Sequence, residues 1–342
     1  MHCWALGGNY GAMPLDDAAF VLEALERFCD ERRLGYSAYP MHEVTAHPMA
    51  PDIIRLFAPH LGEHGPGYDP ILTPGTPLAS RPDWKDVVDA AKECGAHALW
   101  VAFHGFGGEH ERQLNRPGAF EETCLAVRRA HECGLGVGAN VFLTKPGLCG
   151  FDRMLAVLVQ LPLGTLWIGP ASFTPTSRGR RYETLRPELT DLLPIAEHVV
   201  EVSDVNADVW RDLPSYTEAA WARRAVEGDW PATEPSREPR YQLVCRRNLD
   251  LYTGTTGVYY RLHGNLRHDG AERVLERALV YGPVSDEAIY LGGGPSSPAL
   301  AAGWGDQGST RVYFEHRSVR YCWLDRRQAR QLHGEGVLNQ PD

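Results

Sequence analysis

Polar and titratable residues stand after several predicted strands, whereas the strands themselves are apolar. Glu43 follows a short strand-like run at 36–39, His104 follows a run at 97–103, and Asn140 lies within 137–143. Carboxylate, imidazole and amide groups transfer protons, bind metals or orient a substrate. In a β/α fold the site lies on the loops after the strand carboxyl ends, so this contrast predicts a site at that face.

Alternating helical and strand-like patterns must position these loops. Strands are predicted at 36–39, 70–73, 97–103, 137–143 and 165–168, and helices at 15–34, 51–61, 82–94, 118–133, 152–161 and 187–200. Such alternation calls for a parallel sheet. The predicted fold class is α/β, a partial (β/α)6 TIM-like barrel that lacks its first strand, and an open doubly wound sheet is the alternative. No G-x-G-x-x-G follows the first strand, which disfavours a dinucleotide fold.

The pattern changes after residue 204 and predicts three parts. The barrel spans 1–204, a helical segment with a Pro-rich linker spans 205–240, and a small α+β module spans 241–342. Within the module, strand-like runs at 241–251 and 258–262 precede a helix at 271–281, and a last strand pair is expected within 311–323.

Composition excludes several classes of protein. The 342 residues carry a net charge of −10, so no basic stripe favours nucleic acid as a partner. The longest apolar stretch, 155–169, is interrupted by Gln160, Pro162 and Gly164 and falls short of a membrane helix. No signal-peptide pattern opens the chain, so we expect a cytoplasmic protein without a membrane partner.

The eight cysteines form no C-x-x-C pair, which gives little support to a disulfide framework or a zinc ribbon. Cys29, Cys94, Cys124 and Cys133 lie in helical patterns beside apolar residues. We expect these four to be small core residues.

Several short motifs of the sequence match the pattern of one protein family. The chain opens with His2-Cys3-Trp4 and a glycine-rich loop, and Glu43 stands in the polar segment 41–48. Asn140 lies in the glycine-rich run 134–144, Ser177-Arg178-Gly179-Arg180 precedes Leu185-Arg186-Pro187, and Gly264-Asn265-Leu266 precedes the last predicted helix. Together these segments resemble the radical S-adenosylmethionine (radical SAM) enzymes, with a C-terminal extension similar to a SPASM or twitch domain.

The resemblance implies an activity and a set of site residues. Cys3 would be one of three thiolate ligands of a 4Fe-4S cluster whose open iron binds S-adenosylmethionine. Glu43 would meet the methionyl amino group, Asn140 would lie near the ribose or adenine, and Arg178 would belong to a cofactor-binding Gly-Arg segment. Reductive cleavage of S-adenosylmethionine by an external electron donor would then produce a 5′-deoxyadenosyl radical that modifies a peptide or small molecule.

The sequence also departs from the family pattern. The other two cluster ligands are expected three and seven residues before Cys3, ahead of Met1, so the ligand set is incomplete in this sequence. We therefore expect either a start codon further upstream or a decayed homologue without a cluster. Met41, His42 and Val44 depart from the family motif around Glu43, and Cys245 and Cys322 are too few for an auxiliary cluster.

Two other functions stay open. His42, His47, His104 and His110 could converge above the barrel with Glu43 or Glu109 and hold zinc or iron for a hydrolase. The histidine spacing around Glu43 is H-E-x-x-x-H, which does not match the helical H-E-x-x-H of zinc proteases. Alternatively, a decayed barrel could serve as a non-catalytic binding partner.

Overall fold

The computed structural model describes residues 12–40, 44–61, 76–173, 177–203, 205–229, 243–255, 258–281, 297–314 and 322–323. Its helices are α1 (Leu15–Arg32), α2 (Ala50–Phe57), α3 (Thr76–Ser80), α4 (Trp84–Glu93), α5 (Gly108–Leu114), α6 (Ala119–Glu132), α7 (Lys145–Leu148), α8 (Phe151–Leu158), α9 (Ser177–Glu183), α10 (Leu189–Leu192), α11 (Ala196–Val202), α12 (Ala207–Arg211), α13 (Glu218–Glu227), α14 (Ala271–Tyr281) and α16 (Ser297–Trp304). The strands form two separate sheets, one parallel and one antiparallel, and the architecture is mixed α/β.

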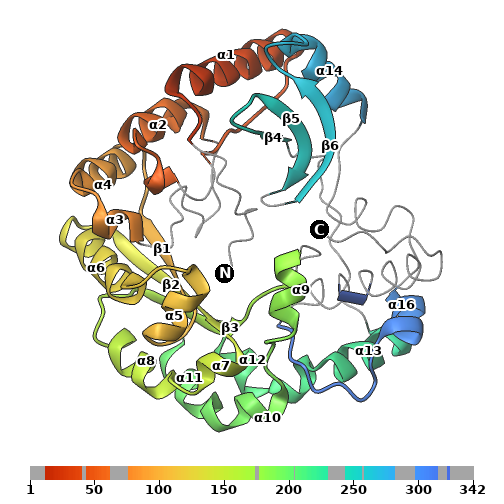
Figure 1. Cartoon of the computed structure of the whole chain (residues 1–342). Coiled ribbons are helices and arrows are strands. Elements are labelled where there is room, and N and C mark those ends of the chain that lie inside the picture. The colour runs from red at the N-terminus through yellow and green to blue at the C-terminus, as the bar shows by residue number, and fades with distance from the viewer. Residues whose placement is uncertain are drawn as a thin grey trace.

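The parallel sheet consists of β1 (Ala98–Phe103), β2 (Gly136–Leu143) and β3 (Thr165–Pro170), in the order β1-β2-β3. Helices connect the strands, as a parallel arrangement requires. Figure 1 shows α2, α4, α6, α8 and α11 following one another around the outside, with the three strands on their inner side. Within the described residues the strands form an open sheet and not a closed barrel.

Side chains alternate between the two faces of this sheet. The outer face, which packs against the helices, carries fully buried residues such as Leu99, Val101, Val141 and Ile168. The opposite face, called the inner face below, is only half-buried and carries Trp100, Ala102, Asn140, Phe142 and Trp167. The burial pattern therefore predicts that any ligand of this sheet would meet the inner face.

The backbone at the edge of β3 is hydrogen-bonded by side chains. The carbonyl of Leu166 accepts from Ser203 Oγ at 2.8 Å, and the carbonyl of Ile168 accepts from Asn206 Nδ2 at 2.7 Å and Trp210 Nε1 at 2.8 Å. Side-chain donors satisfy these carbonyls where a neighbouring strand otherwise would, so this edge is not an open template for pairing.

The second sheet is antiparallel and consists of β4 (Leu243–Cys245), β5 (Asp250–Thr255) and β6 (Val258–Asn265). It shares a core with α14 and also with α1, from the other end of the sequence, as Figure 1 shows. Phe28 and Cys29 of α1 are buried in this core together with Leu249, Leu251 and Val274. Arg32 of α1 adds ion pairs to two glutamates of α14.

The sequence located most of the elements of the first sheet. The predicted strands at 97–103, 137–143 and 165–168 are confirmed as β1, β2 and β3, and the helix at 271–281 is confirmed as α14. The strand predicted at 70–73 lies outside the described residues. The strand predicted at 36–39 is wrong, because this segment joins neither sheet and its Ala38 amide donates to the carbonyl of His60 at 2.8 Å.

The helix predicted at 187–200 is also wrong as one element. It is divided into α10, a 3-10 turn at Leu193–Ile195 and α11. Pro194 explains the division, because proline lacks an amide hydrogen and clashes with the preceding turn of a helix.

Candidate functional site

The loop after β1 is built around two histidines. The backbone N–H of His104 donates to His110 Nδ1 at 3.1 Å, and the two rings stack with centroids 5.8 Å apart. The His104 ring also stacks on Phe142 of the inner face at 5.4 Å. Gly105 has a φ of +126°, and a Cβ there would come within 2.7 Å of Glu109 Cγ, so only glycine suits this turn.

His110 is completely buried, and its contacts define a neutral ring. Thr123 Oγ1 donates to the carbonyl of Ala119 at 2.8 Å, so it is left to accept from His110 Nε2 at 3.4 Å. Nδ1 is then the unprotonated nitrogen that accepts from His104. Burial lowers the pKa of His110 from 6.5 to about 4, which agrees with a neutral imidazole.

The other residues expected to join these histidines have partners elsewhere. Glu109 accepts from Gln113 Nε2 at 2.9 Å and forms an ion pair with Arg112, both within α5. His47 uses both ring nitrogens, since Nε2 bonds the carbonyl of Met13 at 2.8 Å and Nδ1 accepts from the amide of Met49 at 3.0 Å. Across the described ranges, no group of three or more His, Cys, Asp or Glu side chains is placed to hold a metal ion.

The structure places Asn140 in the middle of the inner face. The strand register aligns it with Ala102 of β1 and with Trp167 of β3, and Phe142 follows two residues later on the same face. Asn140 is half-buried on this face. A primary amide between aromatic side chains can pair with the edge of a flat, hydrogen-bonding ring while the neighbouring rings stack on it.

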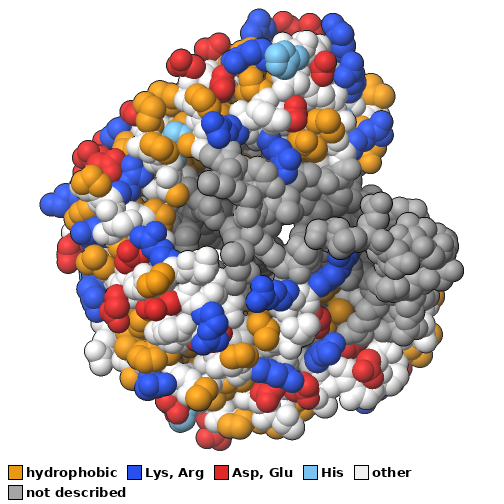
Figure 2. All heavy atoms as spheres, viewed as in Figure 1, with side chains coloured by type: hydrophobic (Ala, Val, Ile, Leu, Met, Phe, Trp, Pro, Cys, Tyr) orange, Lys and Arg blue, Asp and Glu red, His pale blue; other side chains and the backbone are white. Residues whose placement is uncertain are grey.

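The carboxyl end of β2 continues into a capped turn. Thr144 Oγ1 accepts from the amide of Gly147 at 3.1 Å and caps α7, so this hydroxyl has a structural use. Lys145 Nζ pairs with Glu188 at 2.6 Å. The backbone of α9 follows the carboxyl end of β3, and Figure 2 shows Lys and Arg side chains over its position. Arg180 and Arg181 of α9 are exposed there.

Three of the four residues predicted to bind a cofactor or metal are not placed. Cys3 and Glu43 lie outside the described residues, as does His42. Arg178 lies in α9, but its side chain is outside the described part. Asn140 is the predicted site residue whose side chain has a defined position. It lies within the central strand of the sheet whose first strand leads into His104, before the carboxyl-end edge where a β/α site is expected.

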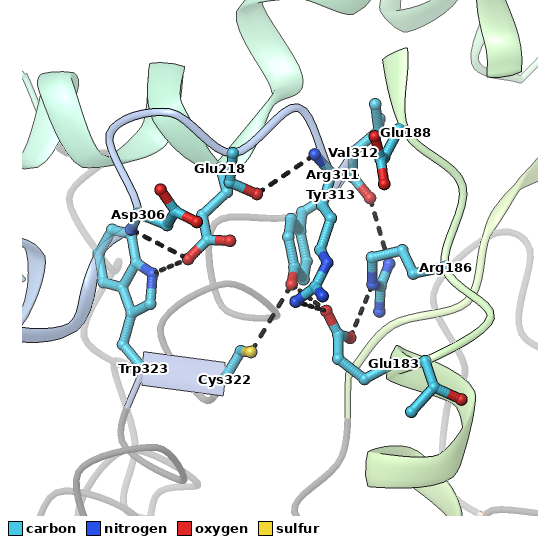
Figure 3. Close-up of polar contacts among 12 residues, drawn as sticks. Glu183, Arg186, Glu188, Glu218, Asp306, Arg311, Val312, Tyr313, Cys322 and Trp323 are labelled. Carbon is cyan, nitrogen blue, oxygen red and sulfur yellow. Dashed lines mark hydrogen bonds and ion pairs between the residues drawn. The ribbon is translucent and has the colours of Figure 1, made fainter. Parts of the chain in front are cut away.

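A buried polar cluster beyond β3 was not predicted as a unit (Figure 3). Arg186 is 1% exposed and donates to Glu183 Oε2 at 2.8 Å, to the carbonyl of Ala171 at 2.8 Å and to the carbonyl of Val312 at 3.2 Å. Tyr313 donates its hydroxyl proton to the second oxygen of Glu183. Arg186 is part of the sequence motif Leu185-Arg186-Pro187, but its partner Val312 lies far along the chain.

Charge compensation explains the ionisation of this cluster. Burial disfavours both charges, but Arg186 holds the pKa of Glu183 below its ordinary value. In turn Glu183 raises the pKa of Arg186 against the effect of burial. Burial, followed by the charge of Glu183, raises the pKa of Tyr313, which therefore stays a phenol. Within the cluster Glu183 is paired with Arg186 at 2.8 Å and with Arg311 at 3.9 Å.

Residues 309–314, called the C-terminal strap below, are held by this cluster and by backbone bonds on both sides. The amide of Leu189 donates to Thr310 at 2.8 Å, and the amide of Tyr313 donates to Tyr216 at 2.8 Å. Trp221 Nε1 adds a bond to the carbonyl of Tyr313 at 2.8 Å, and Glu218 accepts from Trp323 Nε1 at 2.9 Å (Figure 3). The C-terminal strap is therefore held in a fixed position beside β3.

The Gly264-Asn265-Leu266 motif forms a structural turn. Asn265 Nδ2 donates to the carbonyl of Asn248 at 2.6 Å and to Asp250 at 3.0 Å, while its Oδ1 accepts from the amides of Arg267 and His268. The amide side chain thus ties β6 to the start of β5 and to the segment before α14.

Comparison with known proteins adds no further information on the site. No family model matches the chain, and no curated protein matches it. In the part of the chain that the structure describes, no helix is both long and apolar enough to cross a membrane.

Proposed function

We propose that this chain is a radical SAM-like protein that binds S-adenosylmethionine and acts on a peptide or small molecule. In this proposal β1–β3 and their covering helices are part of a partial (β/α) barrel, and the inner face holds the adenosyl group. The parallel α/β architecture and the sequence motifs both support it. An external electron donor would be its partner.

The observation that carries this proposal is the position of Asn140. Its half-buried amide stands on the inner face in register with Trp167 and two residues before Phe142. Adenine is a flat ring with a donor and an acceptor on one edge, and an asparagine amide matches that edge with two hydrogen bonds. Aromatic side chains stack on any base. These residues would orient the adenosyl group and exclude water from it.

The described cysteines do not fit an iron–sulfur cluster. They are distributed over different elements, and burial raises the pKa of Cys124 to about 11 and that of Cys245 to about 12, so both stay protonated thiols. A cluster ligand must be a thiolate. The cluster part of the proposal therefore rests on the resemblance at Cys3. Bound to a reduced cluster, S-adenosylmethionine supplies hydrogen-abstraction chemistry.

Titration calorimetry with S-adenosylmethionine tests the proposal. The chain, prepared anaerobically with iron and sulfide, should bind it, and Asn140→Ala should weaken the Kd between about twofold and about a hundredfold, the loss of one or two hydrogen bonds. Gln160→Ala is the matched control, because it removes an exposed amide from the loop before β3, at the opposite end of the sheet. No heat of binding to the wild-type chain would overturn the proposal.

A second measurement separates the cluster from cofactor binding. Bound iron and sulfide are counted after reconstitution of a chain that includes the two cysteines expected three and seven residues before Cys3, and Cys3→Ala should lower both. If the wild-type chain binds S-adenosylmethionine but no iron, the radical step is lost and a binding protein derived from such a barrel is the better description. The contacts of His47, His110 and Glu109 give no comparable support to the hydrolase alternative.

A further inference from the structure

Two glycines of the inner face lie beneath aromatic rings. A Cβ on Gly138 would come within 2.8–2.9 Å of the Trp100 indole, so this ring lies directly on the backbone of β2. A Cβ on Gly169 would come within 2.5 Å of Phe314 Cε2 and 3.0 Å of Trp167 Cη2. Phe314 therefore covers the part of β3 from which no side chain projects.

Phe314 comes from the C-terminal strap and not from the sheet. The preceding residues, Val312 and Tyr313, are 0% exposed and fixed by Arg186, Trp221 and the backbone of Tyr216. Because hydrogen bonds hold the C-terminal strap on both sides, the strap fixes where the Phe314 ring lies.

The environment of Phe314 is aromatic, yet the ring is only half-buried. Its centroid lies 6.1 Å from Trp167, 5.6 Å from Trp210 and 6.1 Å from Tyr216, at interplanar angles of 69–89°. These edge contacts fix the ring without covering all of it. In the strand register Gly169 follows Trp167 by two residues on the inner face, so Phe314 stands on the carboxyl side of Trp167.

We infer that Phe314 is a specificity-determining residue that presents a flat apolar surface to an aromatic ring of the substrate. The inference rests on the proposed function in one respect, namely that the inner face is a ligand site. Asn140 and Trp167 would bind the ligand deeper on the sheet, and Phe314 would select what lies next to it toward the strand carboxyl ends. A planar ring can stack on the exposed part of an aromatic side chain, whereas a puckered ring loses stacking contact.

Ligand-observed NMR with indole and cyclohexanol as probes tests this inference. Indole should bind the wild-type chain more tightly than cyclohexanol. Phe314→Leu keeps the apolar volume but removes the flat ring, and it should weaken the Kd of indole between about twofold and tenfold. Phe314→Tyr should retain binding. Phe151→Leu, at a buried position of α8, is the control that lowers stability without changing the Kd of indole.

The outcomes separate this inference from the proposed function. Indole binding that depends on Phe314, in a chain that does not bind S-adenosylmethionine, upholds the inference and overturns the proposed function. Equal indole binding by wild type and Phe314→Leu overturns the inference, even where S-adenosylmethionine binds. Equal binding of indole and cyclohexanol, or no binding of either probe, also overturns it.

Discussion

At the scale of single residues, His110 couples stability to pH. Burial lowers the pKa of His110 in the folded chain from 6.5 to about 4. Between these two pH values the unfolded chain binds a proton at His110 and the folded chain does not. The free energy of unfolding should therefore fall as the pH drops from 6.5 toward 4. The shift of about 2.5 pKa units corresponds to a loss of about 3 kcal/mol.

Urea unfolding at pH 7 and pH 4.5 measures this effect. The stability advantage of wild type over His110→Gln should shrink at the lower pH, because glutamine carries no titrating group. His198→Gln, at an exposed position, is the control and should follow wild type at both pH values. Parallel pH dependences of wild type and His110→Gln would contradict the assignment of His110 as a buried neutral ring.

At the scale of elements, close contact on the inner face limits the size of the side chain at position 138 of β2. Gly138→Ala would place a methyl group 2.8–2.9 Å from the Trp100 indole, and the ring would have to move. Overpacking of this kind costs about 1–3 kcal/mol. Gly303→Ala is the control, since nothing lies within 4 Å of a Cβ there and alanine favours helix α16 by about 0.5–1 kcal/mol. Thermal unfolding of both variants should give shifts of opposite sign.

The ion pair that fixes the C-terminal strap gives a second prediction at this scale. Arg186→Met removes the nearer positive charge from the mostly buried Glu183 carboxylate and leaves it Arg311 at 3.9 Å, at a cost of up to about 3–5 kcal/mol. Glu183→Gln in addition should recover part of that loss, because the poorly compensated charge is gone. A double-mutant cycle by urea unfolding measures the coupling. Additive losses would show that the two residues do not act as a pair.

The same pair has a defined pH dependence. The pKa of Glu183 is lowered in the folded chain, so its contribution to stability is present above the unfolded value near 4.5 and is lost as the pH falls through the folded pKa. The coupling energy of the cycle should therefore be larger at pH 7 than at the acid end of the range.

At the scale of the whole molecule, the sequence predicts the type of a local element better than it predicts which distant segment packs against that element. The apolar run in 137–143 is a local pattern, so β2 could be predicted, whereas the inward position of Asn140 follows only from the burial in the structure. The segment at 36–39 has strand-like residues, but Ala38 hydrogen-bonds His60 of the 3-10 helix Ala58–His60, and no local pattern predicts that no strand pairs with it. Likewise, the burial of Arg186 depends on Val312 and Tyr313, which are distant in sequence.

The shared core of α1 and the antiparallel sheet was missed for the same reason. The amphipathic pattern of α1 predicts a buried stripe, but it does not say which surface covers that stripe. By its position in the sequence this helix belongs to the predicted barrel segment 1–204. The structure buries Phe28 and Cys29 against Leu249, Leu251 and Val274 of the C-terminal module.

The last prediction follows from this shared core. Phe28 is 5% exposed, and the Arg32 guanidinium lies over its ring at 4.0 Å while pairing with Glu276 of α14 at 2.7 Å. Phe28→Ala should lower the free energy of unfolding by about 3–5 kcal/mol through transfer and cavity terms. Because the cavity opens in the core that α1 shares with the module, hydrogen exchange should lose protection in β5 and α14 as well as in α1. Val280→Ala, at a position 88% exposed in α14, is the control and should change stability by less than about 0.5 kcal/mol. Unchanged protection in β5 and α14 would mean that α1 and the C-terminal module unfold independently.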